Sequence, residues 1–153
     1  MRLRAQGRKI LVVDDAVEIL DLMALVLEKR GYEVWCSENG RDAWEKIQAS
    51  TPDLILADIL MPGMDGLELC DLVKSDSRFS AIPFILMTSA TADSDISDGF
   101  WRIGTRADGF FSKPFNPLEV AAMVDHLVLG IALPKEIFDI SNPGGGAARV
   151  RKA

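Results

Sequence analysis

The sequence predicts a doubly wound α/β fold, in which a five-stranded parallel sheet carries helices on both faces. Short apolar segments alternate along the chain with longer segments of helical periodicity, and this order is typical of strands joined by crossover helices. The first apolar segment, residues 10–13, has no polar position, as expected of a strand buried on both faces. With 153 residues, 48% of them hydrophobic, the chain is long enough for one domain with a full core.

The first two strand–helix units lie between residues 9 and 50. A strand at residues 9–13 is followed by a helix at residues 17–30, and Gly31 supplies the residue that commonly ends a helix in the left-handed conformation. A short strand at residues 33–36 then precedes an amphipathic helix at residues 41–50.

Two further units follow. A strand at residues 54–57 ends at Asp58, and a loop rich in proline and glycine separates it from a helix at residues 67–74. The next unit consists of a strand at residues 84–87 and a weaker helical pattern at residues 95–103.

The last unit begins with a strand at residues 109–112. Asn116 is expected to cap the final helix, with Pro117 at its first position, and the helix extends to residue 129 or 133. These patterns predict a folded domain at residues 9–133, preceded by an N-terminal extension at residues 1–8. Residues 134–153, which include the segment NPGGGAARVRKA, are predicted to be a disordered tail or linker.

Composition excludes several classes of function. The net charge of −6 argues against nucleic acid as the main partner, because phosphate backbones attract a basic surface. No segment approaches the ~18 apolar residues of a membrane span. Cys36 and Cys70 lack CxxC spacing and fit free thiols in a reducing compartment. We therefore expect a cytoplasmic protein that binds neither nucleic acid nor membranes directly.

Polar residues follow four of the five predicted strands. They are Asp14 and Asp15 after the first strand, Asp58 after the third, Thr88 after the fourth and Lys113 after the fifth. In a parallel sheet of this kind, ligands bind beyond the carboxyl ends of the strands. The sequence therefore predicts that all five residues meet at one edge of the sheet.

Three carboxylates at one edge repel one another, at a cost of roughly 3 kcal/mol for a pair ~5 Å apart at an effective dielectric of ~20. A divalent cation removes this repulsion, and oxygen ligands of this kind suit Mg²⁺. Lys113 supplies a positive charge and Thr88 a hydroxyl, both suited to phosphoryl oxygens. Asp58 can then act as a nucleophile, because carboxylates form aspartyl-phosphates.

The order of these residues resembles that of receiver domains in two-component response regulators. The matching motifs are the Asp14-Asp15 pair, Asp58 followed by ILMPGMDG, Thr88-Ser89-Ala90, and Lys113-Pro114-Phe115. The resemblance covers about residues 9–129. It implies a flavodoxin-like sheet with strand order 2-1-3-4-5.

The resemblance also implies a role for each site residue. Asp58 would accept a phosphoryl group from a histidine kinase or a histidine phosphotransfer protein. Asp14, Asp15, Asp58 and the backbone carbonyl of Leu60 would bind Mg²⁺.

In the same resemblance Lys113 would pair with the phosphoryl group, and Thr88 and Phe110 would change position as switch residues. Such a domain is a signalling module that catalyses only its own phosphorylation and dephosphorylation. It acts on an output partner that the sequence does not identify. The resemblance is also compatible with a homodimer that forms on phosphorylation.

Several residues differ from the family pattern, and the first helix has two possible roles. Leu60 and Ala90 are apolar at positions where family members tune phosphoryl lifetime, so we hypothesise slow self-dephosphorylation. Arg106 and the 25-residue step from Thr88 to Lys113 depart from the family pattern around the fourth helix. In the first helix, burial against the sheet competes with a kinase-docking face.

Three other functions compete with this interpretation. A metal-dependent phosphatase with an aspartyl nucleophile needs a second acid where Leu60 stands. A flavin carrier of the same fold needs a hydroxyl-rich phosphate loop after the first strand, and Asp14 and Asp15 would repel the flavin phosphate. A phosphorylation-independent interaction module is the third, although such modules commonly lose site residues that this chain retains.

Overall fold

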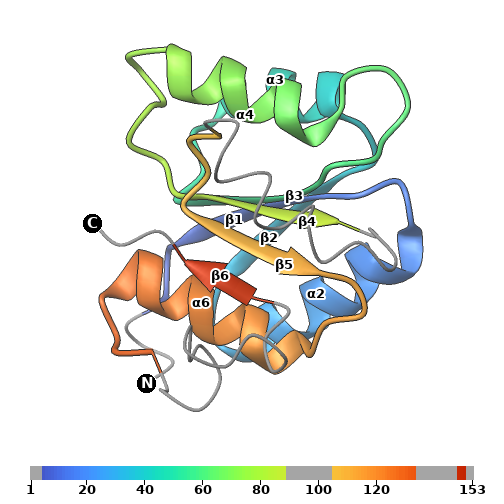
Figure 1. Ribbon diagram of the computed structural model, residues 1–153. Coiled ribbons are helices and arrows are strands. Elements are labelled where there is room, and N and C mark those ends of the chain that lie inside the picture. Colours follow the sequence, from blue (N-terminus) through green and yellow to red (C-terminus); the bar gives the residue numbers. More distant parts are fainter. Residues whose placement is uncertain (1–4, 89–104, 134–147, 151–153) are drawn as a thin grey trace.

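Parallel strands form the centre of the molecule, and helices cover both faces of the sheet (Figure 1). The computed structural model describes residues 5–88, 105–133 and 148–150. Within these ranges the strands are β1 (Lys9–Val13), β2 (Glu33–Ser37), β3 (Leu54–Asp58), β4 (Phe84–Thr88), β5 (Gly109–Ser112) and β6 (Ala148–Val150). The helices are α2 (Val17–Lys29), α3 (Gly40–Ala49), α4 (Gly66–Ser75) and α6 (Pro117–Leu129).

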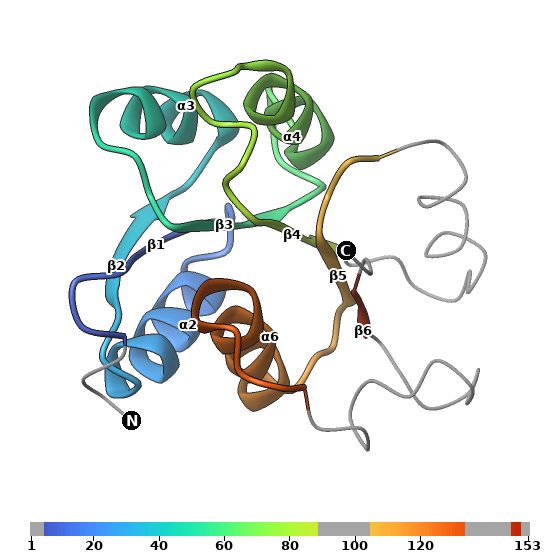
Figure 2. The ribbon, with the colours of Figure 1, turned by 90° about the vertical axis from the view of Figure 1, so that its left-hand side faces the viewer.

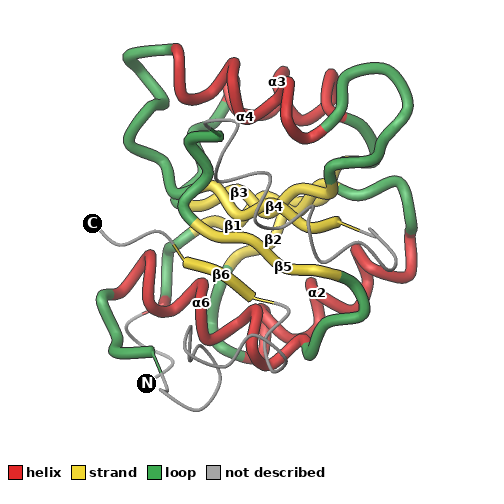
Figure 3. Tube along the Cα trace, viewed as in Figure 1, coloured by secondary structure: helices red, strands yellow, loops and turns green. Residues whose placement is uncertain are grey.

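The sheet order is β2-β1-β3-β4-β5-β6 across the described residues, and the first five of these strands are parallel. The order 2-1-3-4-5 that the sequence implied is therefore confirmed. Helices α3 and α4 lie on one face and α2 and α6 on the other, so the strands form the middle layer (Figures 2 and 3). Strands β3 and β4 are buried at every position because both faces are covered.

Each face of the sheet has its own apolar core. Phe110 points into the core beneath α3 and α4, whereas the next residue, Phe111, lies in the core beneath α2 and α6. This alternation follows from the two-residue period of a strand. Among the described residues no helix has the length and apolar character needed to cross a membrane.

Local sequence explains where the elements begin and end. Gly31 has a φ of 101°, a left-handed conformation that glycine adopts without strain after the end of α2. Asn116 caps α6 by accepting a hydrogen bond from the backbone N–H of Leu118, at 2.9 Å. Strands β1 to β5 and the four helices begin and end within one residue of the predicted positions. For the last helix the sequence allowed an end at residue 129 or 133, and α6 ends at Leu129. The helix expected at residues 95–103 lies outside the described residues.

The two ends of the chain differ from the sequence expectation. Residues 134–153 were expected to be disordered, but Ala148–Val150 forms strand β6, which pairs antiparallel with β5. The outer edge of β5 offers unpaired backbone groups, and pairing with them stabilises a short segment whose own sequence carries no strand pattern. In the expected N-terminal extension, Ala5 is 1% exposed and packs into the core beneath α2 and α6.

Candidate functional site

The five polar residues predicted at one edge follow strands whose ends lie level with one another. Asp14 and Asp15 come directly after β1, and Asp58 and Thr88 are the last residues of β3 and β4. Residue pairing in the sheet aligns Val13 with Ala57, Asp58 with Met87 and Thr88 with Ser112. Lys113 follows Ser112 directly, and its backbone N–H donates to the carbonyl of Thr88 at 2.6 Å.

The three carboxylates form a compact acidic cluster. Asp14, Asp15 and Asp58 each offer a carboxylate oxygen, and these oxygens lie within 4.8 Å of one another. Asp14 is 0% exposed and Asp58 is 4% exposed, whereas Asp15 is exposed to solvent. An all-oxygen set of this size matches the ligands of Mg²⁺, which takes a few carboxylates and keeps several waters. The acidic cluster is therefore able to bind a metal ion.

Lys113 offsets part of the negative charge. Its Nζ lies 2.8 Å from Oδ2 of Asp14 and 3.4 Å from Oδ2 of Asp58. Burial alone would lower the pKa of the Lys113 ammonium, but its hydrogen bond to Asp14 and the charges of Asp14 and Asp58 raise this pKa above its usual range. The lysine is therefore held in its charged form between the two buried carboxylates.

Asp58 remains only partly compensated. Burial and the charge of Asp14 raise the pKa of its carboxyl above the usual range, and Lys113 opposes both effects. Its Oδ1 is buried and has no hydrogen-bond partner among the described residues. Since a buried carboxylate oxygen without a partner is costly, this atom marks where a cation or an incoming group is needed. The donor set and this oxygen together fit a bound Mg²⁺ ion.

Backbone contacts hold the two buried acids in place. The N–H of Asp14 donates to the carbonyl of Ser37 at 3.0 Å, and its Oδ1 accepts from the N–H of Ala16 at 2.9 Å. Behind Asp58, the first residue of α4 is Gly66, where a Cβ atom would lie 2.3 Å from the carbonyl oxygen of Asp58. Only glycine allows α4 to begin this close to the end of β3.

The other predicted site residues are placed differently. Thr88 is 4% exposed at the end of β4, and Leu60 is 61% exposed in the loop after β3. Phe110 is 1% exposed within the core, below the level of the carboxylates along β5. The structure thus joins four of the predicted residues, Asp14, Asp15, Asp58 and Lys113, by short distances between their side chains.

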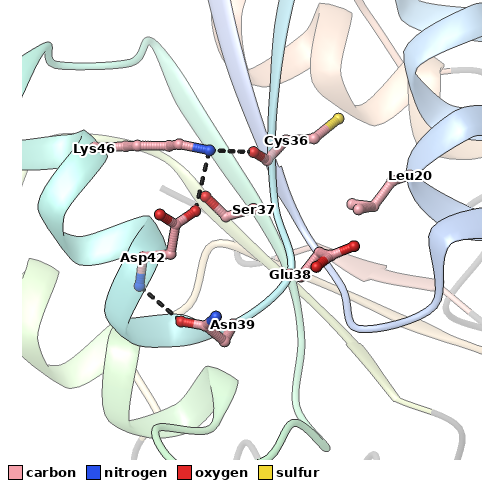
Figure 4. A pocket seen from close by; sticks show the side chains of 7 residues that line it. All are labelled: Leu20, Cys36, Ser37, Glu38, Asn39, Asp42 and Lys46. Atoms are coloured by element: carbon pink, nitrogen blue, oxygen red, sulfur yellow. Dashed lines mark hydrogen bonds and ion pairs between the residues drawn. The ribbon is translucent and has the colours of Figure 1, made fainter.

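A pocket of about 510 Å³ lies beside this edge, at the end of β2 and the start of α3 (Figure 4). Three of its polar side chains contact other residues of the fold: Asn39 caps α3 by accepting from the N–H of Asp42 at 2.8 Å, and Lys46 bonds to the carbonyl of Cys36 at 2.5 Å and to Asp42 at 3.0 Å. The sequence does not predict this pocket, because none of its residues forms a recognisable motif. Ser37 links it to the acidic cluster through the N–H of Asp14.

Apolar side chains lie exposed around the site. Helix α2 buries Leu20, Met23 and Leu27 against the sheet, but leaves Val17 48% and Leu25 53% exposed. Both interpretations of this helix are therefore compatible with its structure, since one stripe packs inward and another faces solvent. At the start of α6, Leu118 is 60% exposed.

Comparison with known proteins identifies the same family as the sequence motifs. A family model for the response regulator receiver domain matches residues 10–125. A response regulator from Chloroflexus aurantiacus is 30% identical, with a TM-score of 0.70 over 81% of this chain and 99% of that chain. The receiver domain of a signal transduction histidine kinase from Syntrophus aciditrophicus is 31% identical, with a TM-score of 0.71 over 86% of this chain and 97% of that chain.

A chemotaxis response regulator from Vibrio cholerae is also 31% identical, with a TM-score of 0.69 over 78% of this chain and 98% of that chain. The family model spans well over half of the chain, and the matched structures are covered almost completely. These matches agree with the strand order and with the acidic cluster at the carboxyl edge of the sheet. The chain therefore belongs to the response regulator receiver domain family.

Proposed function

We propose that this receiver domain accepts a phosphoryl group on Asp58 and signals through the change in conformation that follows. The observation that carries the proposal is the environment of Asp58. This buried carboxylate has one oxygen that finds no partner in the described part of the chain, stands next to two further acids and faces the ammonium of Lys113. The donor would be a phosphohistidine on a histidine kinase or a histidine phosphotransfer protein, as in the family.

The transfer requires little from the protein beyond position and charge. A carboxylate oxygen of Asp58 attacks the phosphorus, the phosphorus–nitrogen bond of the phosphohistidine breaks, and its electron pair returns to the imidazole, which takes up a proton. Lys113 is placed to neutralise charge on the phosphoryl oxygens. A Mg²⁺ ion held by Asp14, Asp15, Asp58 and the carbonyl of Leu60 would supply further neutralisation at the same oxygens.

Conformational switching would follow from the new charge. Phosphorylation adds about −1.5 to −2 charges, and new charge-assisted hydrogen bonds from Thr88 and Lys113 contribute about 1.5–3 kcal/mol each. Inverting a 1:99 population requires about 5.5 kcal/mol. Two such bonds reach this value only at the upper end of their range and only if both form after phosphorylation. Lys113 already lies 3.4 Å from Asp58, so its added contribution is the smaller one, and Phe110 would adjust in the core.

Exposed apolar side chains beside the site supply a docking surface for the phosphodonor. Val17 follows the Asp14-Asp15 pair, and Leu118 follows Lys113 along the chain, and both are about half exposed or more. Kinase contacts here would surround Asp58. Because histidine kinases take their phosphoryl group from cytoplasmic ATP, we also infer a cytoplasmic location.

The test is the intact mass of the protein after incubation with acetyl phosphate, with and without Mg²⁺. We expect one adduct of about 80 Da in the wild type that requires Mg²⁺. Asp58→Asn is expected to abolish it, whereas Asp71→Asn, a matched change of an exposed aspartate in α4, is expected to leave it intact. An adduct that persists in Asp58→Asn would overturn the assignment of the acceptor.

A further inference from the structure

Strand β6 occupies an unusual position in this molecule. It pairs antiparallel with β5 at the end of an otherwise parallel sheet, through Gly109 with Val150, Phe110 with Arg149 and Phe111 with Ala148. In Figures 1 and 2 the strand lies against β5, on the side away from β4. Without it, β5 would present a row of unpaired backbone groups to its surroundings.

The strand that β6 covers also carries a residue of the candidate site. Lys113 follows β5 directly and holds Asp14 and Asp58 through its ammonium. Both aromatic residues of β5 are fixed in the cores, Phe110 at 1% and Phe111 at 0% exposure. Because side chains pack on both faces of β5, the whole strand moves as one rigid body when Lys113 is displaced.

We propose that β6 is a latch on the outer edge of β5, and that phosphorylation of Asp58 weakens its pairing. This inference rests on the proposed function of Asp58. It assigns a regulatory role to the C-terminal segment of the chain, which closes the edge of the sheet in the unphosphorylated state.

Strand order determines the direction of the coupling. Asp58 ends β3, so it lies on the side of β5 opposite to β6. A phosphoryl group on Asp58 carries more negative charge than the carboxylate that Lys113 already contacts at 3.4 Å, so it attracts Lys113 more strongly and pulls the end of β5 toward β4 and away from β6. The pair nearest the site, Phe111 with Ala148, is the first to be pulled apart.

The pairing is short enough to respond to such a displacement. Three residue pairs hold β6, and residues 130–147 connect it to α6 along the chain. Because β6 belongs to the same chain as β5, the latch re-forms within the molecule when the charge is removed. The same coupling acts in reverse, because linkage requires that opening the latch favours the phosphorylated state by the same factor.

The test compares two double variants of the full chain. Arg149→Pro/Val150→Pro removes a ladder hydrogen bond whichever of the two residues faces β5, since alternate residues donate in an antiparallel pair. Arg149→Ala/Val150→Ala is the matched control, because it truncates the same side chains and keeps both backbone donors.

Amide hydrogen exchange measures the latch directly. In the unphosphorylated protein we expect amides of β5 that point away from β4 to exchange at least fivefold faster in the proline variant than in the wild type or the alanine variant. Equal exchange in all three proteins would overturn the proposal, because β6 would then not protect β5 in solution.

Beryllofluoride with Mg²⁺, a mimic of the phosphoryl group, measures the coupling. We expect it to accelerate exchange of the same amides in the wild type, and to bind the proline variant three- to tenfold more tightly than the alanine variant. Unchanged exchange and equal affinities would overturn the coupling and leave β6 as a structural cover.

Failure of the proposed function is distinguishable from failure of the latch. If the wild type shows no binding of beryllofluoride and no acetyl-phosphate adduct on Asp58, the acceptor function fails and the coupling falls with it. A normal adduct with unaltered β5 exchange overturns the latch alone.

Discussion

At the scale of single residues, Asp58 combines two properties that work against the stability of the fold. It is buried, and it stands within 4.8 Å of two other carboxylates. Two unit charges at this separation repel by about 3.5 kcal/mol at an effective dielectric of ~20, and Lys113 recovers part of this energy. The site therefore stores repulsion that a cation or a reaction at Asp58 relieves.

Asp58→Asn is expected to stabilise the protein in the presence of EDTA. The amide keeps the shape of the side chain and removes one charge from the cluster, so the free energy of unfolding should rise by about 1–2 kcal/mol. Thermal unfolding measures this effect. Asp71→Asn, an exposed position, is the control and should change stability by less than about 0.5 kcal/mol; a less stable Asp58→Asn protein would contradict the proposed repulsion.

Leu60 is expected to prolong the lifetime of the phosphorylated state. Its side chain is 61% exposed two residues after Asp58, and it cannot orient a water for attack on the phosphorus because it has no polar atom. We expect a half-life of minutes or longer, measured by the decay of the mass adduct. Leu60→Gln should shorten this half-life severalfold, with Leu118→Gln, another exposed leucine, as the control; a wild-type half-life of seconds would refute the idea.

At the scale of elements, Lys74 joins α4 to the starts of two strands. Its Nζ donates to the carbonyl of Ile82 at 2.7 Å and to Oδ2 of Asp108 at 2.9 Å, and the same carboxylate oxygen accepts from the N–H of Phe84 at 2.9 Å. The lysine side chain is only 8% exposed. The contact thus fixes α4, β4 and the segment before β5 relative to one another.

Lys74→Met is expected to lower the free energy of unfolding by about 2–3 kcal/mol. Removing one partner leaves Asp108 without its cation, although 32% exposure of that side chain allows some solvation. Thermal or urea unfolding tests this value. Lys29→Met at the exposed end of α2 is the matched control; equal stability of the two variants would show that the contact contributes nothing.

Elements with strong periodicity could be predicted from the sequence, and so could the residues at their ends. The continuous apolar strands β1 and β3 lead directly to Asp14 and Asp58, and a parallel sheet brings such ends together whatever the details of packing. Strand β6 could not be predicted in this way. Its three residues have no pattern of their own and depend on the edge of β5, which is a property of the assembled sheet.

Contacts between side chains could not be predicted from the sequence either. The ammonium of Lys113 lies 2.8 Å from Asp14 and 3.4 Å from Asp58, and spacing along the chain does not determine these distances. The burial of Ala5, in a segment expected to be an extension, depends on the core that α2 and α6 form around it. The sequence indicates which residues gather, and the packing decides which of them touch.

At the scale of the whole molecule, the acidic residues at the amino ends of the strands differ from those at the carboxyl ends in how far their negative charge is neutralised. At the edge where the strands begin, Asp53 accepts from the N–H of Lys9 at 2.7 Å, Asp108 binds Lys74, and Asp125 binds both Arg30 and Tyr32. At the opposite edge, three carboxylates cluster, and only two of them, Asp14 and Asp58, contact the ammonium of Lys113 among the described residues. One edge stabilises the fold, and the other is poised for ligand binding.

This asymmetry predicts that Mg²⁺ stabilises the whole fold through the acidic cluster. A ligand at ten times its Kd adds about 1.4 kcal/mol to the free energy of unfolding, which corresponds to about 3–6 °C in Tm for a chain of this size. We expect Mg²⁺ to raise the Tm of the wild type by this amount over EDTA. Asp15→Asn should lose most of the rise and still fold normally, because Asp15 is the exposed member of the cluster.

Two controls separate binding at the cluster from a general effect of salt. Asp71→Asn removes an exposed aspartate from α4 and should retain the full rise in Tm with Mg²⁺. Sodium chloride at the same ionic strength should produce little change, since a buried cluster is screened weakly by monovalent ions. If Asp15→Asn and the wild type gained the same number of degrees from Mg²⁺, the ion would be acting elsewhere on the protein, and the carboxyl edge of the sheet would not be the metal site.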